Sequence, residues 1–126
     1  MEKEEKSLLA MKELRSMLTP KKHLLTVGDV FCNADITGDD DPKVGGSWKE
    51  YWKIFTKEDF PTTCPFCGKP LVDDDVSGCH IKIAGMLSGS WSMKKFIIPG
   101  HQNCNLKVND EFTAKISLTA VEAIKK

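Results

Sequence analysis

Two pairs of side chains in this sequence have the types and the spacing of metal ligands. Cys64 and Cys67 are separated by two residues in a stretch that also contains Pro and Gly, and His101 and Cys104 repeat that spacing farther along the chain. Zinc in proteins is commonly held by four such ligands, arranged as a tetrahedron. Gly68 directly after the first pair can adopt the left-handed conformation that lets both thiolates face one point. The pattern therefore predicts a structural zinc site formed by Cys64, Cys67, His101 and Cys104.

Other residues leave alternatives to this ligand set open. The Cys64–Cys67 pair could be a thioredoxin-like redox pair, although the flanking sequence lacks a βαβ pattern. Cys79 and His80 could supply a ligand in place of His101. Cys32 is expected to be a buried or half-buried thiol.

The composition favours a metal over disulfides as the stabilising element. The chain has 126 residues, of which 40% are hydrophobic, and such a small domain gains from a metal or a disulfide. Five cysteines are an odd number, and we expect neither a secretory leader nor a membrane span, so the protein is predicted to be cytoplasmic, where disulfides are rare. Basic and acidic residues number 18 each. Zero net charge argues against a strongly electrostatic nucleic-acid binder but leaves room for a local basic patch.

Three helices are expected around the ligands. Residues 7–18 have apolar side chains at helical spacing and end before a proline, which predicts an amphipathic helix. Ser47 and Glu50 have capping-box spacing, which predicts a second helix over residues 47–56. Residues 117–126 have a similar pair and end in lysines, which predicts a C-terminal helix. The second helix carries an aromatic stripe that would pack on the zinc module or, alternatively, stack on bases: Trp48, Tyr51, Trp52 and Phe55.

Short strands are expected between these helices. Residues 24–31 predict a strand, and residues 33–46 an acidic loop. Strands over 79–83 and 94–98 would form a hairpin, followed by a short helix that opens at residue 101. A knuckle, a hairpin and a helix that begins with two ligands are the layout of a treble-clef zinc finger. We therefore expect an α+β fold with flanking N- and C-terminal helices. Residues 1–46 would hold the first helix and the acidic loop, and residues 47–126 the treble-clef domain.

The stretch CPFCGKPL…GCHIKI…KKFIIPGHQNCN, within residues 64–105, resembles the zinc-stapled subset of HNH nucleases. It covers about a third of the chain, and the segment before it resembles the lead-in of small bacterial or phage proteins with this zinc core. The resemblance implies a ββα-metal core in which His80 is the general base that activates water. A magnesium-type ion near Asn109 or Asp110 would polarise the scissile phosphate. Asn105 matches the Asn that follows the second zinc pair.

The sequence departs from the HNH pattern at the catalytic positions. Cys79 stands where the family has an acidic residue or His, no Asn lies between His80 and His101, and the final His is missing. These departures favour a non-catalytic zinc-binding module that binds nucleic acid or protein. The alternative is a divergent metal-dependent endonuclease that cleaves DNA. The residues that could form a nucleic-acid surface are Lys82, Lys94, Lys95, Lys107 and Trp91.

Overall fold

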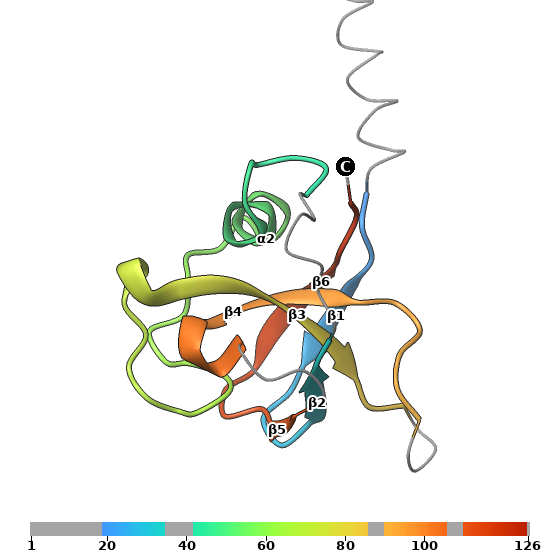
Figure 1. Cartoon of the computed structure of the whole chain (residues 1–126), viewed down its shortest axis with the longest axis vertical. Coiled ribbons are helices and arrows are strands. Elements are labelled where there is room, and N and C mark those ends of the chain that lie inside the picture. The colour runs from blue at the N-terminus through green and yellow to red at the C-terminus, as the bar shows by residue number, and fades with distance from the viewer. Residues whose placement is uncertain (1–18, 35–41, 86–89, 106–109, 126) are drawn as a thin grey trace, which may run out of the picture.

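A six-stranded antiparallel sheet organises the chain, with the strands in the order β1-β6-β4-β3-β2-β5 (Figure 1). The computed structural model describes residues 19–34, 42–85, 90–105 and 110–125. The strands are β1 (Lys22–Leu25), β2 (Val30–Asn33), β3 (Val76–Ile83), β4 (Phe96–His101), β5 (Glu111–Thr113) and β6 (Leu118–Glu122). The helices are α2 (Trp48–Thr56) and the 3₁₀ turns η1 (Asp73–Asp75) and η2 (Gln102–Asn105). The expected mixture of α and β structure is confirmed.

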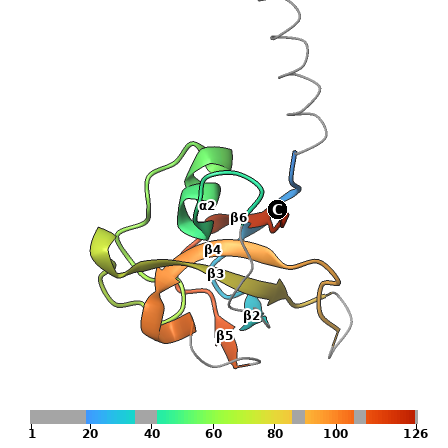
Figure 2. The ribbon, with the colours of Figure 1, turned by 45° about the horizontal axis from the view of Figure 1, so that its top comes forward.

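Both faces of the sheet are covered, and side chains that alternate between the faces along the strands contribute to two core clusters. Helix α2 lies against β3, β4 and β6 on one face (Figure 2). The cluster beneath this helix contains Tyr51, Trp52, Ile97 and Val121. A larger cluster includes Phe31, Phe66, Cys79, Ile81 and Ile98. The turn that holds Cys64 and Cys67 packs against this second cluster.

Helix α2 forms where its capping box predicts. Ser47 is the N-cap in an extended conformation, and its side chain accepts a hydrogen bond from the backbone N–H of Glu50 at 3.3 Å. The aromatic stripe packs on the sheet, and its polar atoms bond to β6: the Trp52 indole N–H donates to the Thr119 carbonyl at 2.7 Å. Burial of Tyr51 raises the pKa of its hydroxyl to about 12. The stripe is therefore part of the core.

Gly78 in β3 lets the start of α2 approach the sheet. A Cβ at this position would lie 2.5 Å from the backbone N of Lys49 and 2.5 Å from the carbonyl C of Trp48. Backbone atoms of a packed helix cannot move aside easily. We therefore expect Gly78→Ala to lower the free energy of unfolding by about 1–3 kcal/mol, measured by urea denaturation. Ser77→Ala, one position away, is the control and should change it by less than about 0.5 kcal/mol. Equal values for the two variants would contradict this view of Gly78.

The predicted C-terminal helix is wrong, because residues 118–122 form strand β6. This strand pairs with β1 on one side and with β4 on the other. Leu118, Ala120 and Val121 are buried in it. Thr119 and Glu122, the pair that suggested a helix cap, both lie in this strand, and Glu122 forms a salt bridge with Lys94 at 2.8 Å. Pairing on both sides outweighs the local helix signal.

The short helix expected to open at residue 101 is also corrected. Strand β4 continues through Pro99 and Gly100 to His101, and the 3₁₀ turn η2 follows it. Pro99 is tolerated because β6 pairs with β4 only at Phe96 and Ile97, so Pro99 lies beyond the doubly paired part of the strand.

The remaining expectations are met in part. The single strand expected over 24–31 is two strands, because a turn with Gly28 at φ +94° separates β1 from β2. The loop expected from residue 33 begins later, since Asn33 ends β2. The β3–β4 hairpin forms as expected and β3 begins earlier, at Val76. The helix predicted over 7–18 lies outside the described residues.

The sheet combines strands from both sides of residue 46, since β2 pairs with β3. None of the helices in the described ranges is long and apolar enough to cross a bilayer.

Candidate metal centre

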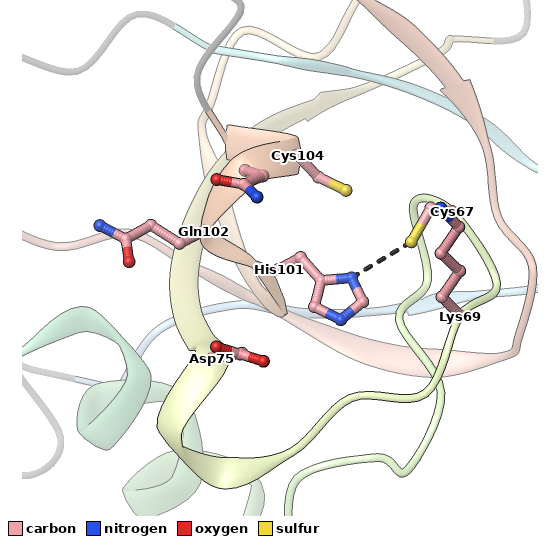
Figure 3. Close-up of a pocket in the computed structure, with 7 residues that line it drawn as sticks. Cys67, Lys69, Asp75, His101, Gln102 and Cys104 are labelled. Carbon is pink, nitrogen blue, oxygen red and sulfur yellow. Dashed lines mark hydrogen bonds between the residues drawn. The ribbon is translucent and has the colours of Figure 1, made fainter.

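Four potential ligands from two distant segments meet at one end of the β3–β4 hairpin. Cys64 and Cys67 lie in the turn that follows α2, His101 ends β4, and Cys104 lies in η2. Their Sγ and imidazole nitrogen atoms all lie within 4.8 Å of one another. Ligands of one tetrahedral zinc ion would lie about 3.5–4 Å apart, given zinc–ligand bonds of about 2.0–2.3 Å. The four side chains are therefore close enough to share one ion. Figure 3 shows Cys67, His101 and Cys104, whose side chains point toward one another.

Backbone hydrogen bonds shape the turn that presents the first two thiols. The N–H of Cys64 donates to the Lys69 carbonyl and the N–H of Gly68 donates to the Cys64 carbonyl, both at 2.9 Å. Gly68 has φ +76°, as the sequence predicted. The backbone N–H of His101 donates to Cys64 Sγ at 3.4 Å, which links this turn to the end of β4.

The hydrogen bond on one side of the His101 ring fixes which nitrogen can bind a metal. Nε2 lies 2.8 Å from the Pro70 carbonyl oxygen. Because a carbonyl only accepts, Nε2 must carry the proton, and Nδ1 is left as the acceptor. Nδ1 lies 3.2 Å from Cys67 Sγ. A backbone carbonyl that holds the outer ring N–H is the usual support of a metal-binding histidine.

The thiols differ in how readily they ionise. Burial raises the pKa of Cys67, but the hydrogen bond from the Lys69 backbone N–H and side-chain hydrogen bonds within the cluster outweigh it and bring this pKa to about 7. Burial and the neighbouring Cys64 and Cys67 raise the pKa of Cys104. Crowded thiolates repel one another, and a bound cation would relieve that repulsion. The cluster is thus electrostatically suited to a divalent ion.

An aromatic side chain between the two cysteines anchors the turn to the sheet. Phe66 is 2% exposed, and its ring centroid lies 4.9 Å from those of Phe31 and Phe112, edge to face in both pairs. Gly100 of β4 makes room for the ring, since a Cβ there would lie 2.6 Å from Phe66 Cε1. Sequence reasoning did not single out Phe66, although a large apolar residue inside a polar, Gly-rich turn is itself a signal of anchoring.

Asn33 is a second residue that sequence reasoning missed. It was placed in the acidic loop, but it ends β2, and its side-chain Nδ2 donates to the carbonyl of Cys104 at 2.7 Å. Phe31, Cys32 and Asn33 are all buried, so the sequence VFCN shows no polar–apolar alternation that could have placed Asn33 in a strand.

Cys79 and His80 do not join the cluster. Cys79 is buried, its thiol donates to the Ser77 carbonyl at 3.5 Å, and burial together with Cys64 and Cys104 raises its pKa, so it is a neutral thiol beside the site. His80 is 2% exposed, and its ring lies 4.5 Å from the ring of Trp48 at 80°, beneath α2.

Of the residues that the HNH resemblance assigned to a second, catalytic ion, the described parts of the chain include His80 and Asp110. There the four ligands named above are the one group of three or more His, Cys, Asp or Glu that could hold a metal. Asp110 is exposed before β5, and its carbonyl accepts a hydrogen bond from the backbone of Asn33 at 3.1 Å. Asn109 lies outside the described residues.

The lysines proposed for nucleic-acid binding are only partly placed. Lys94 is engaged in the salt bridge with Glu122, Trp91 is half-buried, and Lys107 lies outside the described residues. The basic nucleic-acid surface therefore stays a prediction.

Comparison of the chain with protein-family models, with curated proteins and with solved structures found no match. The functional conclusion therefore rests on the geometry of the candidate metal centre.

Proposed function

We propose that this protein is a non-catalytic binding module whose fold is stabilised by one structural zinc ion. The observation that carries the proposal is the convergence of Cys64, Cys67, His101 and Cys104, with all four ligand atoms within 4.8 Å of one another. Four protein ligands complete a tetrahedron and leave no position for a reacting water, which is typical of a structural site. Thiolate and imidazole ligands suit zinc, whereas magnesium and calcium prefer oxygen.

An ion in this position would cross-link the turn at residues 64–67 to the end of β4 and to η2. The protein supplies a preformed turn, an oriented Nδ1 of His101 and an aromatic anchor in Phe66. Metal binding at such sites contributes directly to the free energy of folding. We extend the proposal to a treble-clef arrangement, which the knuckle, the β3–β4 hairpin and the ligand-bearing turn support. The treble-clef layout has a helix that begins at the second ligand pair, whereas this protein has the 3₁₀ turn η2 there.

A divergent HNH endonuclease with His80 as general base is the weaker proposal. A general base must reach the water that it deprotonates. His80 is covered by Trp48 and the rest of α2, and it would need displacement of the helix to reach substrate and a magnesium ion.

Between the two classes of partner, the described surface favours protein over nucleic acid. The net charge is zero and Lys94 is paired with Glu122, so the chain has no overall excess of cations to attract phosphates. Three apolar side chains from β1 to the start of β2 are well exposed: Leu24 at 66%, Val27 at 59% and Val30 at 39%. Exposed apolar side chains contribute to contacts with protein rather than with phosphates.

Metal analysis of the purified chain tests the proposal. We expect one zinc per chain, and cobalt substitution should give the absorption of a tetrahedral site with thiolate ligands. DNA nicking with magnesium or manganese, and gel shifts of DNA or RNA at about 150 mM salt, should both be negative. A chain without metal would overturn the zinc site. Nicking that disappears in a folded His80→Ala variant would overturn the non-catalytic assignment, and a gel shift would replace protein by nucleic acid as the partner.

A further inference from the structure

We infer that Asn33 is a positioning residue of the metal centre, and that its side-chain amide sets the affinity for zinc by holding the backbone of Cys104. This inference rests on the proposed zinc site. Asn33 is 1% exposed, and Nδ2 donates to the Cys104 carbonyl at 2.7 Å across 71 positions of sequence. This buried amide donates to Cys104, the one candidate ligand that lies beyond the last strand of the hairpin.

Cys104 depends on this support more than the other ligands do. Cys64 and Cys67 are held by the hydrogen bonds of their own turn, and His101 is paired with Val76 across the hairpin. Cys104 lies past the end of β4 in η2, and 3₁₀ turns have poorer hydrogen-bond geometry than α-helices. The direction from which its Sγ reaches the metal is therefore set by an external contact.

The support comes from a rigid part of the sheet. Asn33 pairs with Ile81 of β3, and the preceding Phe31 is fully buried in the core. The backbone N–H of Asn33 also donates to the Asp110 carbonyl at 3.1 Å. One residue thus holds both ends of the stretch from Cys104 to Asp110, and it connects β2 to the metal centre.

The hydrogen bond from Asn33 to Cys104 can be tested by a substitution that hardly changes the volume of the side chain. An amide both donates and accepts, whereas an ionised carboxylate only accepts. Asn33→Asp therefore removes the donor, sets an oxygen against the Cys104 carbonyl and adds a negative charge near three thiolates. Loss of an outer-shell hydrogen bond at a metal site typically costs about 10–100-fold in affinity.

Competition of the full-length chain against a chromophoric zinc chelator measures this effect. We expect Asn33→Asp and Asn33→Ser to bind zinc at least about tenfold more weakly than the wild type, with altered thiolate-to-metal absorption in the cobalt form. Tyr51→Phe is the matched control. It removes a buried hydroxyl that donates to the Glu122 carbonyl beneath α2, so its zinc affinity should fall only by the amount that the loss of fold stability explains.

Three results would overturn the inference and each is distinct from failure of the zinc site itself. Asn33 variants that bind zinc as tightly as the wild type would show that the bond is irrelevant to the metal. Variants weakened only as much as Tyr51→Phe would show a general effect of stability. Loss of folding in both Asn33 variants with excess zinc would assign Asn33 to the sheet as a whole. A wild-type chain that binds no zinc overturns the proposed function as well.

Discussion

Chelation of the metal is expected to abolish the cooperative thermal transition of this protein, or to lower its midpoint by more than about 15 °C. Structural zinc contributes about 10–16 kcal/mol in small zinc-dependent folds. The total stability of a small domain is only about 5–15 kcal/mol. Because the two quantities are of similar size, the described fold should depend on the ion. Thermal melts followed by circular dichroism, with and without a strong chelator, measure the difference.

Substitution of a ligand should reproduce the effect of chelation. Cys64→Ser and Cys104→Ser should each lose the bound zinc and melt like the chelated wild type. Cys32→Ala provides the matched control, since Cys32 is a buried thiol of β2 that is not part of the cluster. It should retain one zinc per chain. A melting curve that is the same with and without chelator, for a wild type shown to contain metal, would refute a structural role for the ion.

Truncation of Phe66 is the second large effect, and it should weaken both the fold and the metal site. Phe66→Ala removes a 2% exposed ring from between two other aromatic rings, and such changes cost about 3–5 kcal/mol. The same change frees the turn that carries Cys64 and Cys67, so zinc affinity should fall as well. Urea denaturation with saturating zinc gives the first quantity and chelator competition gives the second.

Phe112→Ala is the control for this experiment. Phe112 contacts the same rings, but it is half-buried on the edge strand β5 and lies outside the ligand-bearing turn. It should lower the free energy of unfolding less than Phe66→Ala does, and it should weaken zinc binding less. If Phe66→Ala costs less than about 1 kcal/mol, or if both variants reduce zinc affinity equally, the ring does not anchor the turn.

The candidate ligands could be predicted because their signals are local and paired. Each pair has two residues between its members, and a Gly follows the first pair. These local patterns indicate ligand-bearing turns whatever the rest of the fold is. Helix α2 was predictable for the same reason, since its cap and aromatic stripe lie within ten residues.

The features that sequence reasoning missed depend on partners far along the chain. Residues 118–122 have a cap-like pair, but their structure is decided by pairing with β1 and β4. Asn33 is distinguished only by a bond to a residue 71 positions away. The HNH resemblance identified a His on a strand, but the sequence could not tell that Trp48 covers it.

Gly78 and Gly100 are close neighbours in the β3–β4 register, and each admits a different element against the sheet. Gly78 receives the backbone of α2, and Gly100 receives the ring of Phe66. Helix α2 and the turn that carries Cys64 and Cys67 therefore pack closely against the backbone of these two strands. The two core clusters therefore share the main chain of β3 and β4, so a side chain added at either glycine would push one of these elements away from the sheet.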